Sequence, residues 1–146
     1  MAADDVLSGS TPSIEFLMLA EYAETIHGKL YLMGGAWEAI TVPNLAVPVA
    51  VTVAVSISVP WLATNTRHRL TVAVETGDGE TLAEQAREVM VGRPTHIEAG
   101  ASQRQVIVVP LAVVLPRPDR YAVVASIDEV PRARVSFRAN HGHVHR

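Results

Sequence analysis

The chain of 146 residues contains no cysteine, so disulfides, thiol nucleophiles and cysteine-ligated metal sites are excluded. A chain without cysteine fits a reducing compartment, and we expect a cytoplasmic protein. Aromatic residues are also scarce, at 5% of the chain against 49% for all hydrophobic residues. Valine and alanine therefore supply most of the core, and β-branched valine favours strands over helices.

Positive charge is equally sparse. The net charge is −3, and lysine and arginine form no run along the chain. A nucleic-acid binder shows a basic patch or stripe, and an anionic membrane surface also attracts basic clusters. We therefore expect neither partner. Residues 1–12 lack the basic start and apolar segment of a secretory signal, so we interpret them as a flexible lead-in.

Residues 39–66 carry no formal charge and are long enough for a membrane helix. Pro43, Pro48 and Pro60 interrupt the stretch, and each would break a helix. Residues 49–59 also alternate strictly between branched apolar side chains and small ones. A period of two is typical of a strand, so we predict a soluble β-protein with no membrane span.

The same alternation recurs along the chain between turn signals. His27-Gly28 and Asp78-Gly79 each predict a hairpin turn. The apolar run 106–115 predicts a strand with apolar neighbours on both faces, and Pro110 within it indicates an edge position or a bulge. The pattern predicts an all-β fold: a single antiparallel β-sandwich, immunoglobulin-like, of eight or nine short strands over residues 13–138.

A glycine pair invites comparison with a phosphate-binding loop. Such a loop places its glycines directly before a helix, and its lysine follows them. In HGKLYLMGGAW, Lys29 precedes Gly34-Gly35, and the residues after the pair favour a strand. We predict instead that the glycines form a bulge or a sharp bend.

Catalytic patterns are missing as well. The sequence has no nucleophile elbow, and His27, His68 and His96 each lie in or beside a predicted turn. Neighbouring carboxylates such as Asp128-Glu129 fall in a turn or on opposite faces of a strand, so they make no acid–base pair. We expect a protein that is not an enzyme and needs no cofactor.

Three alternating histidines, His141, His143 and His145, lie in the C-terminal segment 139–146. On an extended chain they share one face, and three imidazoles can bind zinc or copper. No acidic residue is close enough in sequence to complete the set, and the spacing is not that of a closed structural site. We interpret the segment as a solvated histidine-bearing tail.

The two tryptophans leave two alternatives open. Trp61 lies near Asn65 and His68, and an exposed indole at the rim of a sandwich can stack on a sugar. Alternatively, Trp37 and Trp61 cap the ends of the core, since tryptophan is highly buried on average. Tyr121 follows a proline-rich turn at the start of a strand, as in the tyrosine corner of immunoglobulin-like sandwiches. We predict a hydrogen bond from its phenol to a nearby backbone group.

The second face of strand 49–59 is unusual, because it carries Ala50, Thr52, Ala54, Ser56 and Ser58. A solvated face normally shows long charged side chains. Either another layer of the same domain covers this face or a second subunit does. We hypothesise that it serves self-association and that the protein is a homo-oligomer.

Three segments together resemble a family of uncharacterised bacterial proteins, catalogued only as a domain of unknown function. They are SIEFLMLAEYAETIHGKLYLMGGAW, VPWLATNTRHRLTVAVETGDGE and LPRPDRYAVVASIDE. The resemblance covers residues 12–137 and implies a small single-domain β-sandwich in a bacterium. It implies no reaction, ligand or catalytic residue.

These observations favour a non-enzymatic β-sandwich that acts by self-association or as a component of a larger bacterial protein assembly. The alternative is a module for a small ligand of the carbohydrate type, with Trp61, Asn65 and His68 at its rim.

Overall fold

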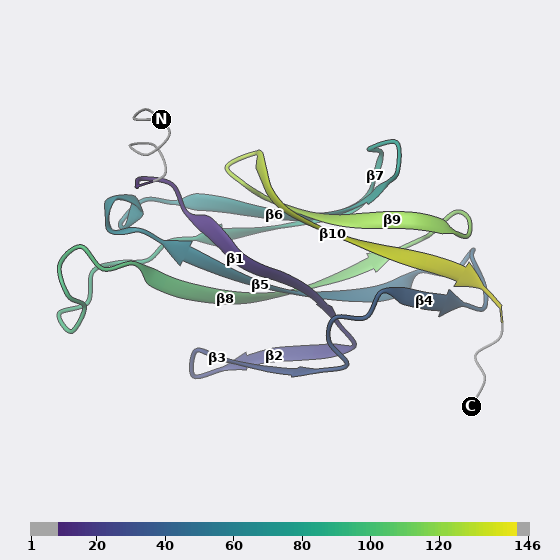
Figure 1. The fold of residues 1–146 in the computed structure, drawn as a ribbon, viewed down its shortest axis with the longest axis horizontal. Helices are drawn as coiled ribbons and strands as arrows, with labels where there is room; N and C mark the ends of the chain where they lie inside the picture. The colour runs from purple at the N-terminus through teal and green to yellow at the C-terminus, as the bar shows by residue number, and fades with distance from the viewer. Residues whose placement is uncertain (1–8, 143–146) are drawn as a thin grey trace.

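The computed structural model describes residues 9–142, which form ten β-strands and one short 3-10 turn, η1, with no α-helix (Figure 1). The strands are β1 (Ser13–Ala20), β2 (Tyr22–Ile26), β3 (Lys29–Met33), β4 (Ala39–Val42), β5 (Val49–Val59), β6 (His68–Thr76), β7 (Thr81–Val89), β8 (Gln103–Val113), β9 (Asp119–Ile127) and β10 (Val130–His141). The prediction of eight or nine strands is therefore wrong, because the described residues contain ten. In these residues no helix has the length and apolarity needed to cross a membrane.

The strands build three sheets. One has the order β1-β5-β8, a second has the order β4-β10-β9-β6-β7, and the hairpin β2-β3 forms the third. Strand β1 also contacts β10, and β7 contacts β8, so the two larger sheets meet along both sides and curl into a half-barrel (Figure 1). The hairpin lies outside this body, beside β5 and β8.

The expectation of a purely antiparallel fold is wrong at one place. Strand β4 runs parallel to β10, with Ala39 opposite Arg138 and Val42 opposite His141. Only strands joined by a tight turn must be antiparallel. Five strands, β5 to β9, lie between β4 and β10 in chain order, so no such turn joins them. Residues 139–141, assigned above to the tail, form the end of β10.

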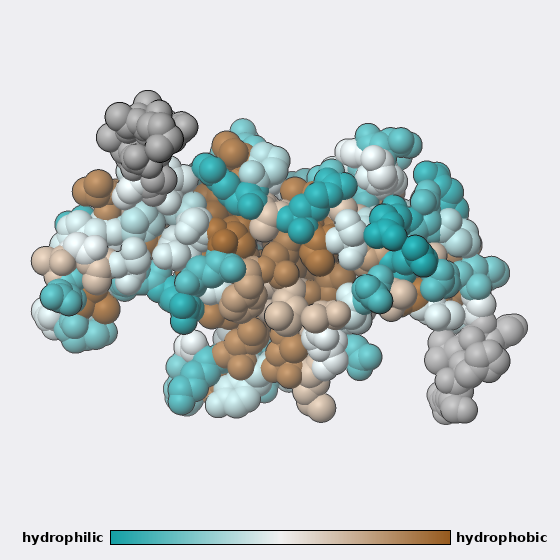
Figure 2. All heavy atoms as spheres, in the orientation of Figure 1, coloured by the Kyte–Doolittle hydropathy of each residue, from teal (hydrophilic) through white to brown (hydrophobic). Residues whose placement is uncertain are grey.

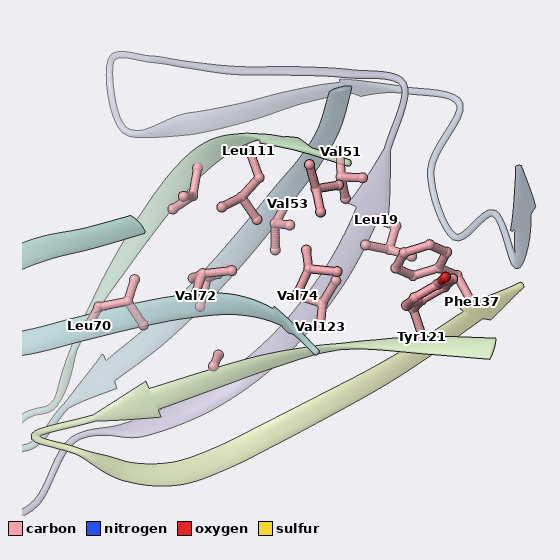
Figure 3. Close-up of a cluster of buried hydrophobic side chains, with 14 of the residues drawn as sticks. Leu19, Val51, Val53, Leu70, Val72, Val74, Leu111, Tyr121, Val123 and Phe137 are labelled. Carbon is pink, nitrogen blue, oxygen red and sulfur yellow. The ribbon is translucent and has the colours of Figure 1, made fainter. Parts of the chain in front are cut away.

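The core lies between the two larger sheets (Figure 3). Val51 and Val53 of β5 point toward Val72 and Val74 of β6, and all four are fully buried. The alternation in residues 49–59 thus marks a strand, as predicted. Burying a valine side chain stabilises the folded state by about 1.5–3 kcal/mol. Rows of buried valines can therefore stabilise this core although it contains few aromatic side chains.

Three of the seven aromatic residues gather at one end of this core. Phe137 stacks on Tyr121 with ring centroids 5.8 Å apart, and Trp37 meets Phe137 edge-on at 5.4 Å. The Tyr121 hydroxyl donates to the carbonyl of Arg117 at 2.5 Å and accepts from the Arg117 amide at 3.3 Å. The predicted hydrogen bond of a tyrosine corner is confirmed. Trp37 packs against the core, in agreement with the alternative in which the tryptophans cap its ends.

The turn predictions also hold. His27 and Gly28 have φ angles of 50° and 75° and join β2 to β3 by a two-residue turn. Gly34, with φ of 62°, bends the chain directly after β3, and a Cβ there would lie 2.7 Å from the Glu21 side chain. The residues around Asp78 join β6 to β7.

Strand β8 lies at the edge of its sheet. This position suits Pro110, because proline has no backbone N–H to donate to a second neighbouring strand. The expectation that both faces of β8 are covered is wrong at this end, where Pro110 and Ala112 are exposed between buried neighbours. The hairpin covers only part of that outer face (Figure 1).

Candidate functional site

The turn between β5 and β6 holds the residues predicted as a sugar rim. Trp61 begins η1 (Trp61–Ala63), and the guanidinium of Arg93 lies 4.0 Å from the centroid of its ring. The same guanidinium donates to the Trp61 carbonyl and to Thr64 Oγ1, both at 2.7 Å. A cation over the ring face stabilises the turn and occupies one side of the indole.

His68 opens β6 and is only 8% exposed. Its Nε2 atom lies 2.9 Å from the Ala63 carbonyl, and its Nδ1 atom lies 3.0 Å from the Asp128 carboxylate. Both partners are hydrogen-bond acceptors, so with an ionised Asp128 the ring satisfies them only when both of its nitrogens carry a proton. Each ring nitrogen thus lies within hydrogen-bond distance of an acceptor from a different segment of the chain.

Asp128 belongs to the two-residue turn between β9 and β10, where its φ angle is 49°. Its second carboxylate oxygen accepts from the Arg69 amide at 2.8 Å. Burial alone would raise the pKa of the Asp128 carboxyl, but the hydrogen bonds from Arg69 and His68 outweigh it and hold the pKa below its usual value. The pair thus ties β6 to the neighbouring turn.

A hollow of about 310 Å³ lies beside this pair. Its lining residues are Arg67, His68, Arg69, Ala86, Arg87, Glu88 and Asp128. Asn65 and Trp61 do not line it. Asn65 is exposed and directs its backbone amide to the Val91 carbonyl at 2.7 Å. The structure therefore brings only His68 of the three predicted sugar-binding residues to this hollow, and sugar binding stays a prediction.

The small-residue face of β5 is covered at its centre by the chain itself. Ala54 and Ser56 are fully buried, Thr52 and Ser58 are half-buried, and Ala50 is exposed. The cross-strand neighbours of Ala54 are Met18 of β1 and Val108 of β8. The first of the two alternatives, that the same domain covers this face, is therefore correct for the middle of the strand.

Glu15 completes that cover and was not anticipated. It lies at a register shift of β1 against β5 and accepts from Ser56 Oγ at 2.8 Å. Arg104 of β8 donates to both of its oxygens, at 2.6 and 2.9 Å. The hydrogen bonds from Arg104 and then from Ser56 lower the pKa of the Glu15 carboxyl to about 2. The carboxylate thus links all three strands of the sheet.

The hairpin β2-β3 carries four of the exposed large hydrophobic side chains in residues 9–142. Its register places Tyr22 opposite Met33, Glu24 opposite Tyr31, and Ile26 opposite Lys29. Side chains of directly opposed residues share one face, so all six point the same way. The exposed fractions of Tyr22, Ile26, Tyr31 and Met33 are 50, 42, 50 and 70%. We call this surface the hairpin face.

The opposite side of the hairpin is packed. Leu30 and Leu32 lie on it and are half-buried, on the side that meets β5 and β8. In Figure 2 apolar atoms extend from the middle of the body down toward the hairpin. The hairpin is thus attached by one apolar face while it exposes another.

Residues 15–140 match the profile of a family described as a family of unknown function, DUF6941. The chain belongs to this family. No curated protein matches the chain. The DUF6941 match covers most of the chain and carries no assigned reaction or ligand.

Solved structures similar to the DUF6941 protein are distant. A glycosyl hydrolase family 2 member from Bacteroides cellulosilyticus DSM 14838 is 14% identical, with a TM-score of 0.40, over 61% of this chain and 12% of that one. A β-glucuronidase from glycoside hydrolase family 2 is 14% identical, with a TM-score of 0.42, over 90% and 11%. The alkylpurine DNA glycosylase AlkC of Pseudomonas fluorescens is 13% identical, with a TM-score of 0.46, over 92% and 32%.

The DUF6941 chain spans at most about a third of the length of these proteins. At such low similarity the matches carry no argument about its activity.

The predicted metal residues are only partly described. His141 ends β10, where it is exposed with its Nε2 atom 3.3 Å from the Pro43 carbonyl. His143 and His145 lie outside the described residues. Across residues 9–142 of the DUF6941 protein, no three metal-ligating side chains gather into a site.

Proposed function

We propose that this DUF6941 protein acts by association with another protein chain, a second copy of itself or a component of a bacterial assembly, and not by catalysis. The hairpin face carries the proposal. Nine large hydrophobic side chains are exposed in residues 9–142, and four of them lie on this one face. Contiguous exposed apolar surface marks interaction sites far more often than single exposed residues do.

The chemistry of the hairpin face suits a protein partner. Tyrosine and methionine are enriched in protein interfaces, and two tyrosines and one methionine lie here. The face also carries one acid, Glu24, and the single lysine of the chain, Lys29. In a twofold dimer each surface meets itself, so one copy's Glu24 has a cation available on the other.

The size of the hairpin face limits how strongly two proteins can associate through it. Strands of five residues are about 17 Å long, and a two-stranded face buries less than the roughly 800 Å² per partner of a standard interface. A dimer formed by this face alone is therefore weak and depends on concentration. A tight complex needs additional surface beside the hairpin.

Sedimentation velocity across a wide concentration range tests self-association. The wild-type protein is expected to shift toward dimer as its concentration rises, whereas a Tyr31→Ser, Met33→Ser double variant stays monomeric. A matched control carries Leu62→Ser and Met90→Ser, which remove comparably exposed apolar side chains elsewhere. If wild-type protein is monomeric at every concentration, self-association is wrong.

An affinity pull-down from the native cell tests a different partner with the same variants. A partner retained by the wild-type and by the Leu62→Ser, Met90→Ser control, but lost with the hairpin variant, supports the proposal. A partner retained equally by all three proteins places the interface elsewhere.

We further propose that the two larger sheets form an immunoglobulin-like sandwich. The tyrosine corner at Tyr121 supports this, since it recurs in that group of folds. An experimental structure whose strand connections match a different arrangement of sheets would contradict the assignment.

A further inference from the structure

Two arginines face each other across β9 and β10. The antiparallel register pairs Arg120 directly with Arg138, and both side chains are exposed. Directly opposed residues have Cβ atoms about 4.5–5.5 Å apart, and like charges at that distance destabilise a sheet. The pair is therefore a local concentration of positive charge on the outer face of the larger sheet.

The nearest carboxylate in sequence, Asp119, is bonded to other groups. Asp119 Oδ2 accepts from the Arg117 side chain at 2.9 Å, and its Oδ1 accepts from the Arg120 backbone amide at 2.7 Å. The backbone hydrogen bond and then the Arg117 side chain hold the pKa of Asp119 below its usual value. Within residues 9–142, neither Arg120 nor Arg138 has an ion pair.

Two hollows lie beside the pair. One, of about 300 Å³, is lined by Glu38, Ala39, Arg120, Ser136 and Arg138. The other, of about 360 Å³, is lined by Pro118, Asp119, Arg120, Arg138, Ala139 and Asn140. Arg120 and Arg138 are the two residues that both hollows share. Each hollow is large enough for a small molecule and is lined by both arginines.

We propose that Arg120 and Arg138 together bind a small free oxyanion, a carboxylate or a phosphate. Guanidinium groups donate paired hydrogen bonds that match the oxygens of these anions, and an anion between them also relieves their repulsion. The Ser136 hydroxyl lines the same hollow and adds a donor. Glu38 lines it too, so the net charge around the ligand is about +1, which favours anions of low charge.

Thermal unfolding of the full chain in sodium phosphate and in sodium chloride, at equal ionic strength and neutral pH, tests the site. Phosphate stabilises most proteins because it is excluded from their surface. The part of the stabilisation that comes from the site is therefore measured by comparing the wild-type protein with variants. Arg120→Gln and Arg138→Gln are each expected to lose the extra stabilisation by phosphate. In chloride each variant is expected to unfold at or above the wild-type temperature, because the repulsion is gone.

Arg134→Gln is the matched control, since Arg134 is an exposed arginine of β10 that faces Val124 instead of a second cation. It is expected to keep the full response to phosphate. Equal responses of all four proteins would overturn the proposal.

A phosphate titration followed by NMR at the arginine Nε atoms gives a second readout. Saturable shifts are expected at Arg120 and Arg138 and not at Arg134. Either arginine variant is expected to weaken the apparent affinity by about tenfold or more. Glu38→Gln is expected to tighten it, because this change removes a negative charge beside the ligand. Unsaturable shifts, or an unchanged affinity in Glu38→Gln, would contradict the proposed geometry.

Discussion

The Nδ1 atom of His68 lies 3.0 Å from the carboxylate of Asp128, although the two residues are 60 positions apart in the chain. This contact connects the first residue of β6 to the turn between β9 and β10. It leaves the imidazole with an acceptor at each nitrogen, since the Ala63 carbonyl faces the other one.

Replacing Asp128 tests that arrangement. Asp128→Ala leaves the Arg69 amide and the Nδ1 atom of His68 without an acceptor, so we expect a loss of about 1–3 kcal/mol in the free energy of unfolding. Asp128→Asn is expected to cost less. Its amide oxygen can accept from Arg69, and its amino group can donate to a neutral His68. Urea unfolding at neutral pH compares the two variants, and equal losses would show that the asparagine recovers neither hydrogen bond.

Glu15 predicts a pH dependence. Its pKa is lowered from 4.5 to about 2, so the folded protein holds this carboxylate more strongly ionised than the unfolded chain does. The stabilisation is complete above pH 4.5 and is lost as the pH falls through about 2.

The Glu15 pair with Arg104 is partly exposed, so we expect at most about 1 kcal/mol at neutral pH. Urea midpoints between neutral pH and pH 2 are expected to fall less steeply for Glu15→Gln than for the wild-type. Glu98→Gln, at an exposed position, serves as the control.

Tyr121→Phe removes one oxygen from the buried end of the core. The change leaves the Arg117 backbone without its hydrogen-bond partner, so we expect a loss of about 1–3 kcal/mol in the free energy of unfolding. The matched change Tyr31→Phe on the exposed hairpin face is expected to alter it by less than about 0.5 kcal/mol. Similar unfolding curves for the two variants would show that the tyrosine corner adds no stability.

Ala54→Val tests whether the outer face of β5 is full. Ala54 is completely buried between its neighbours on β1 and β8, so two added methyl groups are expected to cost about 1–3 kcal/mol. Ala50 is exposed on the same strand face, and Ala50→Val is expected to be within about 0.5 kcal/mol of the wild-type. A neutral Ala54→Val would show that the cover over this face is loose.

Local patterns made much of the fold predictable. The alternation in residues 49–59 predicts a strand and nothing else, because a strand is the only regular element with a period of two. The turn at His27 and Gly28 follows from the positive φ that a two-residue hairpin demands. Tyr121 was recognisable because its partner is only four residues away.

The candidate sites were less accessible to sequence reasoning. Glu15 and Arg104 meet across 89 positions, and Arg120 pairs with Arg138 only in one strand register. A slip of one residue would turn either partner to the opposite face of its sheet, and no local pattern specifies the register between such distant strands. The hairpin was predicted, but its packing as a separate layer was not.

The parallel pairing of β4 with β10 has a consequence for how the protein reaches its folded state. Ala39 of β4 lies opposite Arg138 of β10, about a hundred positions later in the chain, and β10 is the only sheet neighbour of β4 in the described residues. During synthesis β4, with the buried side chain of Val42, therefore cannot pair until the residues of β10 have been made. Contacts this distant in sequence slow folding, so the edge of β4 stays open to other strands until β10 pairs with it.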